Sequence, residues 1–153
     1  MNYDEKLSKN FNLSEFTESR IADKNNINNV PSATQIASLR DLVKNLMQPI
    51  RDYWGLPVRI TSGYRCNALN VLIGGAEKSQ HTKGQACDFT IKGLENIVIV
   101  KALKQLKEQG KIKYDQLILE PTWIHISYDD INNRGEELTK VKSGYIGGFD
   151  NIE

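Results

Sequence analysis

The stretch Ser79-Gln-His81-Thr-Lys-Gly84-Gln-Ala86-Cys-Asp88 places an imidazole, a glycine and a carboxylate close together in the sequence. The chain has two histidines, His81 in this stretch and His125 in Trp123-Ile-His125-Ile-Ser127. Two neutral imidazoles and one carboxylate form a recurring ligand set for zinc, with a fourth position open for water. The sequence therefore predicts a metal site formed by His81, Asp88 and His125.

The residues around these candidate ligands alternate as in half-buried strands. From residue 86 to residue 91, Asp88 shares one face with two small side chains, and the other face is apolar. From residue 123 to residue 128, His125 lies on the face opposite two isoleucines. The small Gly84 and Ala86 allow the loop before the first strand to fold back, so that His81 and Asp88 reach one ion.

The rest of the chain alternates amphipathic helices with short strands. Residues 32–54 predict a long helix with a kink near Pro49, and residues 94–109 predict a second one. Short helices are expected to carry Phe16 and Ile21 inward near the N-terminus and Cys66, Leu69 and Ile73 inward between residues 64 and 73. Strands are expected at residues 56–61, 116–119 and 145–146, in addition to the two above.

These elements predict an α+β fold with helices packed on a small, mainly antiparallel sheet and a zinc site on the sheet face. We expect residues 1–153 to form a single domain, in which residues 1–12 are a lightly ordered polar lead-in. The strands at residues 116–119 and 123–128 are expected to form a hairpin around Pro121 and Thr122.

The composition is that of a soluble protein, with 39% apolar residues, 25% charged residues and a net charge of +1. This balance argues against a nucleic-acid partner, and no apolar run approaches the roughly 20 residues that span a bilayer. We therefore expect a monomer without membrane insertion, made in the cytoplasm without a signal peptide because its N-terminal residues are polar. Cys66 and Cys87 are expected to be free thiols.

Three blocks of the sequence resemble one family. Ser79–Asp88 is similar to the SxHxxGxAxD signature of the zinc D-Ala-D-Ala peptidases, a group of carboxypeptidases, vancomycin-resistance dipeptidases and phage peptidoglycan endopeptidases. Ser62-Gly-Tyr64-Arg65 with Asn70 and Gly74-Gly75 resembles the block upstream, and Trp123–Ser127 resembles the last ligand block. Residues 12–16 and 49–51 resemble the single-domain branch common in phages.

The resemblance implies a role for each matching residue. His81, Asp88 and His125 would bind Zn²⁺, and Arg65 would hold the substrate near the scissile carbonyl, as a forked, permanently charged guanidinium can. Arg65 could instead form a salt bridge that fixes its loop. Ser79 could bind a substrate carboxylate or cap the loop.

The general base is harder to assign from the resemblance. Many members of the family carry an acid three residues before the last histidine, where this chain has Thr122. Glu120 is the nearest carboxylate, and the turn at Pro121 and Thr122 could bring it over the metal. We therefore expect Glu120 to take the proton, since amide hydrolysis needs such a group. Three other carboxylates are alternatives: Asp115, Asp129 and Asp130.

The function that the resemblance implies is hydrolysis of an amide bond in the stem peptides or cross-links of peptidoglycan by a zinc peptidase. Without a signal peptide, such an enzyme would reach the wall through lysis or a holin-type pore, as a phage or prophage lysin does. Two alternatives remain open from the sequence. One is a non-catalytic, zinc-containing peptidoglycan-binding module, and the other is an intracellular D-Ala-D-Ala dipeptidase.

Overall fold

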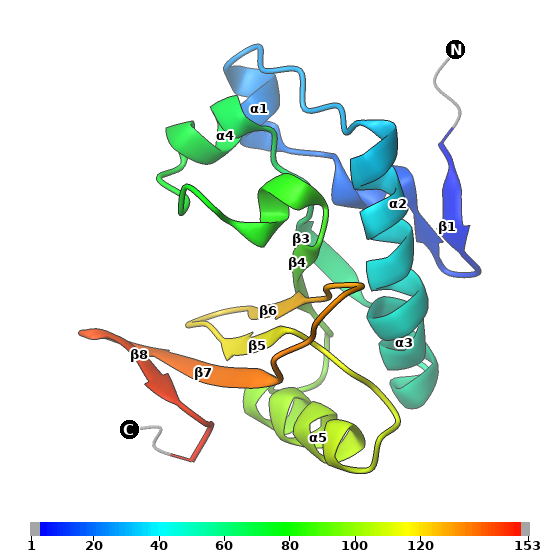
Figure 1. Cartoon of the computed structure of the whole chain (residues 1–153), viewed down its shortest axis with the longest axis vertical. Helices are drawn as coiled ribbons and strands as arrows, with labels where there is room; N and C mark the ends of the chain where they lie inside the picture. Colours follow the sequence, from blue (N-terminus) through cyan, green and yellow to red (C-terminus); the bar gives the residue numbers. More distant parts are fainter. Residues whose placement is uncertain (1–3, 151–153) are drawn as a thin grey trace.

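The computed structural model describes residues 4–150. A six-stranded mixed sheet lies at the centre of the molecule (Figure 1). The strands lie in the order β3-β4-β6-β5-β7-β8, antiparallel except for the parallel pair β5–β7. Their bounds are Arg59–Ser62 for β3, Ala86–Thr90 for β4, Gln116–Leu119 for β5, Ile124–Ser127 for β6, Glu136–Val141 for β7 and Gly144–Gly147 for β8. The predicted α+β class is confirmed.

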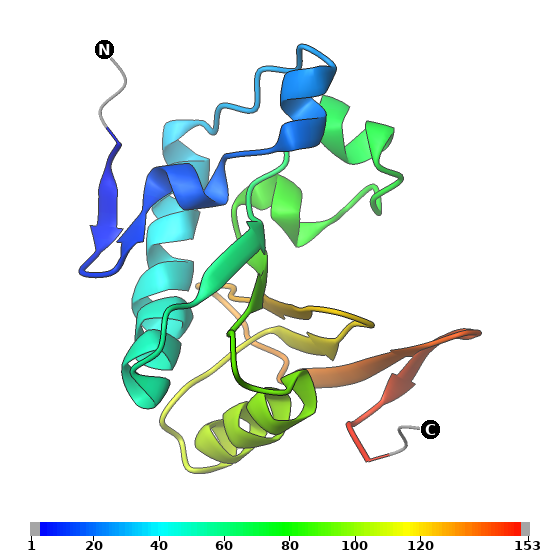
Figure 2. The ribbon, with the colours of Figure 1, turned by 180° about the vertical axis from the view of Figure 1, so that it is seen from behind.

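Helices and short helical turns flank this sheet. They are α1 (Arg20–Lys24), α2 (Ala33–Leu42), α3 (Gln48–Trp54), α4 (Asn67–Leu72) and α5 (Asn96–Glu108), with the 3₁₀ turns η1 (Leu13–Phe16) and η3 (Gln80–Lys83) and the π-helical turn η2 (Val43–Met47). Figure 2 shows α2 and α3 along one side of the sheet and α5 below it.

The sheet has one apolar face, as the alternation in β4 and β6 predicts. Cys87 and Phe89 from β4 and Ile124 and Ile126 from β6 are fully buried in the hydrophobic core. The helices complete that core with apolar side chains from α2, η2, α3 and α5: Leu39, Leu42, Val43, Leu46, Met47, Ile50, Ile99, Val100 and Leu103. The opposite face of the sheet is therefore the one available for polar side chains.

The long helix is continuous but changes its winding where the sequence predicts a kink. Ser32 caps α2, its hydroxyl accepting a hydrogen bond from the Gln35 N–H (3.2 Å). In η2 the Gln48 N–H donates to the carbonyl of Val43, five residues earlier, directly before Pro49. Proline lacks an N–H, and the wider turn accommodates it without ending the helix.

The N-terminal segment differs from the sequence prediction. Residues 6–12 are not a lightly ordered lead-in but a small hairpin, with β1 at Lys6–Ser8 and β2 at Phe11–Asn12. Its order comes from Phe11, which is buried and packs near Phe16. Residues 1–3 of the predicted lead-in lie outside the described residues.

Two further predictions about local structure were wrong. Ile21 and Ile73 are exposed rather than inward, because α1 and α4 are short helices at the rim of the molecule. The short strand predicted at residues 145–146 is confirmed as β8, whereas its partner β7 was not predicted. Figure 1 shows their hairpin projecting beyond the other strands.

Within residues 4–150, no helix combines the length and the apolar character that a membrane crossing requires.

Candidate metal centre

Two strands and one turn bring the three predicted ligands together. Asp88 on β4 is directly opposite His125 on β6, and His81 belongs to η3, just before β4. One ligand atom from each of the three residues lies within 4.8 Å of the other two. The Asp88 Oδ1 atom is 3.0 Å from His125 Nδ1 and 3.3 Å from His81 Nε2. This arrangement is the group that the sequence spacing predicted.

The backbone around His81 holds its ring in one orientation. His81 Nδ1 lies 2.7 Å from the carbonyl oxygen of Gly63, which can only accept a hydrogen bond. The proton is therefore on Nδ1, and Nε2 turns its lone pair toward Asp88. Gly84 ends η3 with a φ of 72°, and a side chain there would meet the Gln35 carbonyl at 2.5 Å. The tight loop return predicted for Gly84 is confirmed.

The electrostatics of this group favour a cation between the three side chains. Burial lowers the pKa of His81, although Asp88 opposes the shift, so the ring tends to stay neutral. Burial raises the pKa of Asp88, but its interactions with His125 and His81 outweigh this effect and leave the pKa well below its usual value. An ionised carboxylate and an imidazole lone pair then face each other at 3.3 Å. A metal cation satisfies both acceptors, so the donor set fits zinc.

Arg65 lies beside the same carboxylate. Its Nη2 atom is 3.5 Å from Asp88 Oδ2, and its Nε donates to the hydroxyl of Ser62 (3.2 Å). Burial lowers the pKa of Arg65, and the charge of Asp88 opposes this change. The ion pair considered as an alternative role is thus present, and the side chain also reaches the cavity described below.

The hairpin between β5 and β6 brings Glu120 to the same face as His125. The Glu120 N–H donates to the Trp123 carbonyl (3.0 Å), which closes the turn over Pro121 and Thr122. Ile118 pairs with His125 and Leu119 with Ile124, so Glu120 is opposite Trp123. Cross-strand partners point to the same face of a sheet, so Glu120 shares a face with Trp123. Residues two apart on one strand also share a face, so Trp123 in turn shares it with His125. The turn therefore places Glu120 on the sheet face that carries His125, and its role as the proton acceptor stays a prediction.

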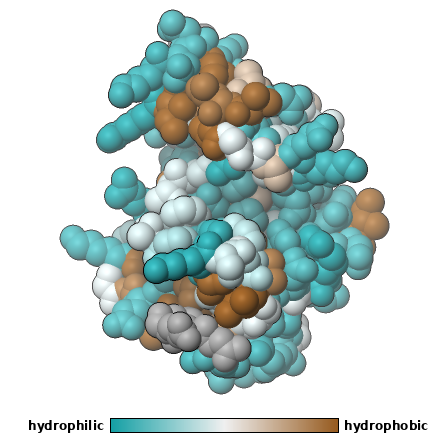
Figure 3. Space-filling model, turned by 90° about the vertical axis from the view of Figure 1, so that its left-hand side faces the viewer, coloured by the Kyte–Doolittle hydropathy of each residue, from teal (hydrophilic) through white to brown (hydrophobic). Residues whose placement is uncertain are grey.

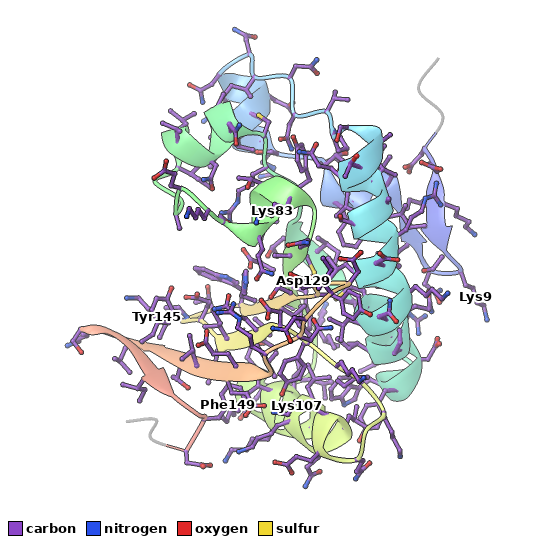
Figure 4. The ribbon with its side chains drawn as sticks, viewed as in Figure 1. Lys9, Lys83, Lys107, Asp129, Tyr145 and Phe149 are labelled. Carbon is purple, nitrogen blue, oxygen red and sulfur yellow. The ribbon has the colours of Figure 1, made fainter. Side chains whose placement is uncertain are left out.

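A cavity of about 690 Å³ joins these side chains. Arg65, Ser79, Glu120 and the three candidate ligands all line it. One row of paired residues crosses the sheet beneath it, from Asp88 through His125 and Ile118 to Leu138. Figure 4 shows Lys83 on the η3 side of this region and Asp129 and Tyr145 on the sheet side.

Ser79 has the capping role that the sequence left open. Its hydroxyl accepts a hydrogen bond from the His81 N–H (3.2 Å) at the start of η3. The residue also lines the cavity, so the cap and a contact with substrate are compatible.

The alternative carboxylates are less suitable than Glu120 as proton acceptors. Asp115 lines the cavity, but both of its oxygens accept hydrogen bonds from the Arg134 guanidinium (2.9 Å each). The Asp129 Oδ1 atom accepts from the backbone N–H groups of residues 131 and 132. Asp130 is exposed and does not line the cavity.

The contribution of the C-terminal hairpin to this cavity was not predicted from the sequence. Leu138 on β7 and Tyr145 on β8 line it, together with Arg134 from the preceding connection. Lys142 and Ser143, followed by Gly144 at the start of β8, are the turn signal that could have indicated this hairpin.

The hydrophobic surface near the cavity is separate from it. Figure 3 shows apolar side chains gathered at the top of this face, and the exposed residues of that region are Val71, Leu72 and Ile73, from the end of α4 and just beyond it. Polar colours predominate between this patch and the lower part of the molecule. The cavity itself has charged groups of both signs on its walls, together with apolar side chains from the sheet.

An α+β fold with a largely buried histidine–aspartate–histidine group that lines a cavity defines a class of candidate metalloenzymes. The comparison with family models then gives the family: residues 9–127 match the model described as peptidase M15. The chain belongs to this family, which consists of zinc-dependent metallopeptidases, and the resemblance seen in the sequence is confirmed at that level. A search among curated proteins found no match.

Proposed function

We propose that this chain is a zinc-dependent peptidase that hydrolyses an amide bond in the stem peptides or cross-links of peptidoglycan. One observation carries the proposal: three ligand atoms within 4.8 Å of one another lie in a cavity that also contains Arg65 and Glu120. The peptidase M15 family supports the reaction type, and the resemblance to D-Ala-D-Ala peptidases supports the substrate class.

In this proposal His81, Asp88 and His125 hold zinc on the polar face of the sheet. Zinc, when bound, supplies a Lewis acid for the scissile carbonyl and lowers the pKa of water. Gly63 keeps His81 in the tautomer whose Nε2 lone pair is free, through the hydrogen bond at Nδ1. Arg65 pairs with Asp88 and so contributes to holding this ligand in place.

Glu120 and Arg65 act on the substrate. Glu120 takes a proton from the attacking water and passes it to the leaving amine, because its carboxylate lies on the same sheet face as His125. Arg65 has donors that Ser62 and Asp88 do not occupy, which suit a substrate carbonyl or carboxylate. Ser79 lines the same wall and offers its hydroxyl to a substrate carboxylate.

The biological setting that we propose is a phage or prophage lysin that acts as a monomer and reaches the wall after lysis or through a holin-type pore. This setting rests on the resemblance of residues 12–16 and 49–51 to the phage branch of the family. Its partner is a peptidoglycan peptide. Nucleic acid and membrane insertion play no part in this proposal.

Incubation of purified peptidoglycan with the zinc-loaded chain tests the proposal, with the products identified by mass spectrometry. We expect new peptide termini, which also identify the bond that is cut. Glu120→Gln keeps the shape of the side chain but cannot accept the proton, so its rate should fall by about 10²- to 10⁴-fold.

The alternatives give other outcomes in the same experiment. Zinc binding without turnover by the wild type on any peptide would favour a non-catalytic binding module. Cleavage of free D-Ala-D-Ala with intact sacculi left untouched would favour an intracellular dipeptidase. Equal rates for the wild type and Glu120→Gln would keep the peptidase and assign the proton to another residue.

A further inference from the structure

The family match ends at residue 127, yet part of the cavity wall comes from residues beyond that point. The later residues that line the cavity are Asp129, Asn132, Arg134, Leu138 and Tyr145. Leu138 continues the row of paired residues from Asp88, His125 and Ile118 across the sheet. The β7–β8 hairpin therefore extends the face that carries the candidate metal centre.

The register of the sheet brings Tyr145 close to Glu120. Strand β5 pairs in parallel with β7, with Leu119 opposite Thr139, so Glu120 and Lys140 come next on their strands. Lys140 pairs with Tyr145 across the β7–β8 hairpin. The hydroxyl of Tyr145 reaches past Lys140 and donates a hydrogen bond to Glu120 Oε1 (3.1 Å).

The ring of Tyr145 is held from a second side. The ammonium group of Lys140 lies 5.0 Å from the centroid of the ring, a cation–π distance. Burial raises the pKa of Tyr145, and the charge of Glu120 adds to the rise, so the phenol stays protonated and remains a donor at neutral pH. The side chain is 52% exposed and belongs to a hairpin that projects from the sheet (Figure 4). A surface tyrosine in this position is thus a fixed hydrogen-bond donor at the edge of the cavity.

We propose that Tyr145 is a positioning residue for Glu120. A glutamate side chain has several rotatable bonds, and a free carboxylate at a solvent-exposed turn samples many orientations. The bond from Tyr145 engages Oε1 and leaves Oε2 to accept the proton from water. This role rests on the proposed function of Glu120, and it assigns part of the active site to residues outside the family match.

The direct test compares wild type, Tyr145→Phe and Tyr53→Phe in steady-state cleavage of a peptidoglycan-derived peptide that the wild type hydrolyses. Tyr145→Phe keeps the ring and removes only the hydroxyl. We expect kcat to fall about tenfold, comparable to the loss of an outer hydrogen-bond partner at a metal ligand, with KM and zinc content unchanged. Tyr53 is a matched control, because it is a similarly exposed tyrosine (56%) on α3 and does not line the cavity.

The double variant separates positioning from a general loss of structure. If Tyr145 acts through Glu120, adding Tyr145→Phe to Glu120→Gln should lower kcat no further than Glu120→Gln alone. An unchanged kcat for Tyr145→Phe, a raised KM with kcat unchanged, or fully additive losses would each overturn the positioning role. In those cases the wild type would still be a peptidase, whereas a wild type without turnover would overturn both proposals.

A measurement that needs no turnover tests the hydrogen bond itself. Nuclear magnetic resonance of ring-labelled tyrosine, assigned with Tyr145→Phe, follows the titration of the Tyr145 phenol. The pKa should fall toward its ordinary value in Glu120→Gln, because the negative charge that opposes the phenolate is removed. An identical pKa in the wild type and Glu120→Gln would show that the two side chains do not interact in solution.

Discussion

The backbone of Gly63 orients one of the candidate zinc ligands. Its carbonyl accepts the hydrogen bond from His81 Nδ1, and its Cα faces the backbone of Phe16. A Cβ atom at this position would lie 2.4 Å from the Phe16 carbonyl oxygen, and a backbone atom cannot move aside as a flexible side chain can.

Gly63→Ala should therefore lower the free energy of unfolding by about 1–3 kcal/mol and weaken zinc binding, because the displaced carbonyl no longer orients His81. Urea unfolding and a zinc titration measure the two effects. Gly147→Ala is the control, because nothing lies within 4 Å of its added Cβ. If both variants unfold at the same urea concentration as the wild type, the close approach at Gly63 has no energetic effect.

At the residue scale, the candidate metal ligands could be predicted because few residue types bind zinc. The sequence contains two histidines, so a zinc site with two imidazole ligands has to use His81 and His125. The alternating pattern of β4 places Asp88 on the polar face, where it can be the third ligand. Tyr145 could not be predicted in the same way. Its hydrogen bond to Glu120 depends on the parallel pairing of β5 with β7. No local sequence pattern indicates which strands pair with each other.

Among the elements, the connection between β6 and β7 is tied to the start of β5 by one ion pair. Asp115 is buried, and its carboxylate accepts two hydrogen bonds from the half-exposed Arg134 guanidinium and one from the Arg134 N–H. These hydrogen bonds lower the pKa of Asp115 below its ordinary value of 3.8. The stabilisation is therefore complete above that value and is lost as the pH falls through the lower pKa of the folded state.

Arg134→Met should reduce the free energy of unfolding at pH 7 by about 1–2 kcal/mol, a value kept low because solvent screens the exposed guanidinium. The difference between wild type and variant should shrink as the pH falls below 3.8 and through the lowered pKa of Asp115 in the folded state. Urea unfolding at pH 7 and at low pH measures this. Lys142→Met is the control, since it removes a positive charge without breaking an ion pair among residues 4–150. A difference that stays constant with pH would contradict the assignment to Asp115.

Elements with a clear periodicity were predicted, and elements held by distant contacts were not. The helix at residues 32–54 and strand β4 each have a regular apolar face, which one local window reveals. Strand β7 carries charged residues and is only partly buried, so its sequence resembles a loop. The N-terminal hairpin has one fully buried side chain, Phe11, and a single apolar residue does not form a periodic pattern that predicts a strand.

For the whole molecule, the candidate metal centre joins the turn η3 to two central strands of the sheet. His81 lies on η3 next to the rim that α4 forms, whereas Asp88 and His125 lie on the central strands. A bound zinc would link η3 to the sheet through these three side chains, and binding would stabilise the folded chain. The same ion would supply the Lewis acid on which the proposed hydrolysis depends.

Hydrolysis of purified peptidoglycan by the metal-free chain, followed while zinc is added, tests this account most directly. We expect no cleavage without metal, a rate that rises until one zinc ion is bound per chain, and no recovery in His81→Ala at any zinc concentration that leaves the protein soluble. Full cleavage by the metal-free chain, or by His81→Ala, would contradict a zinc peptidase centred on His81, Asp88 and His125.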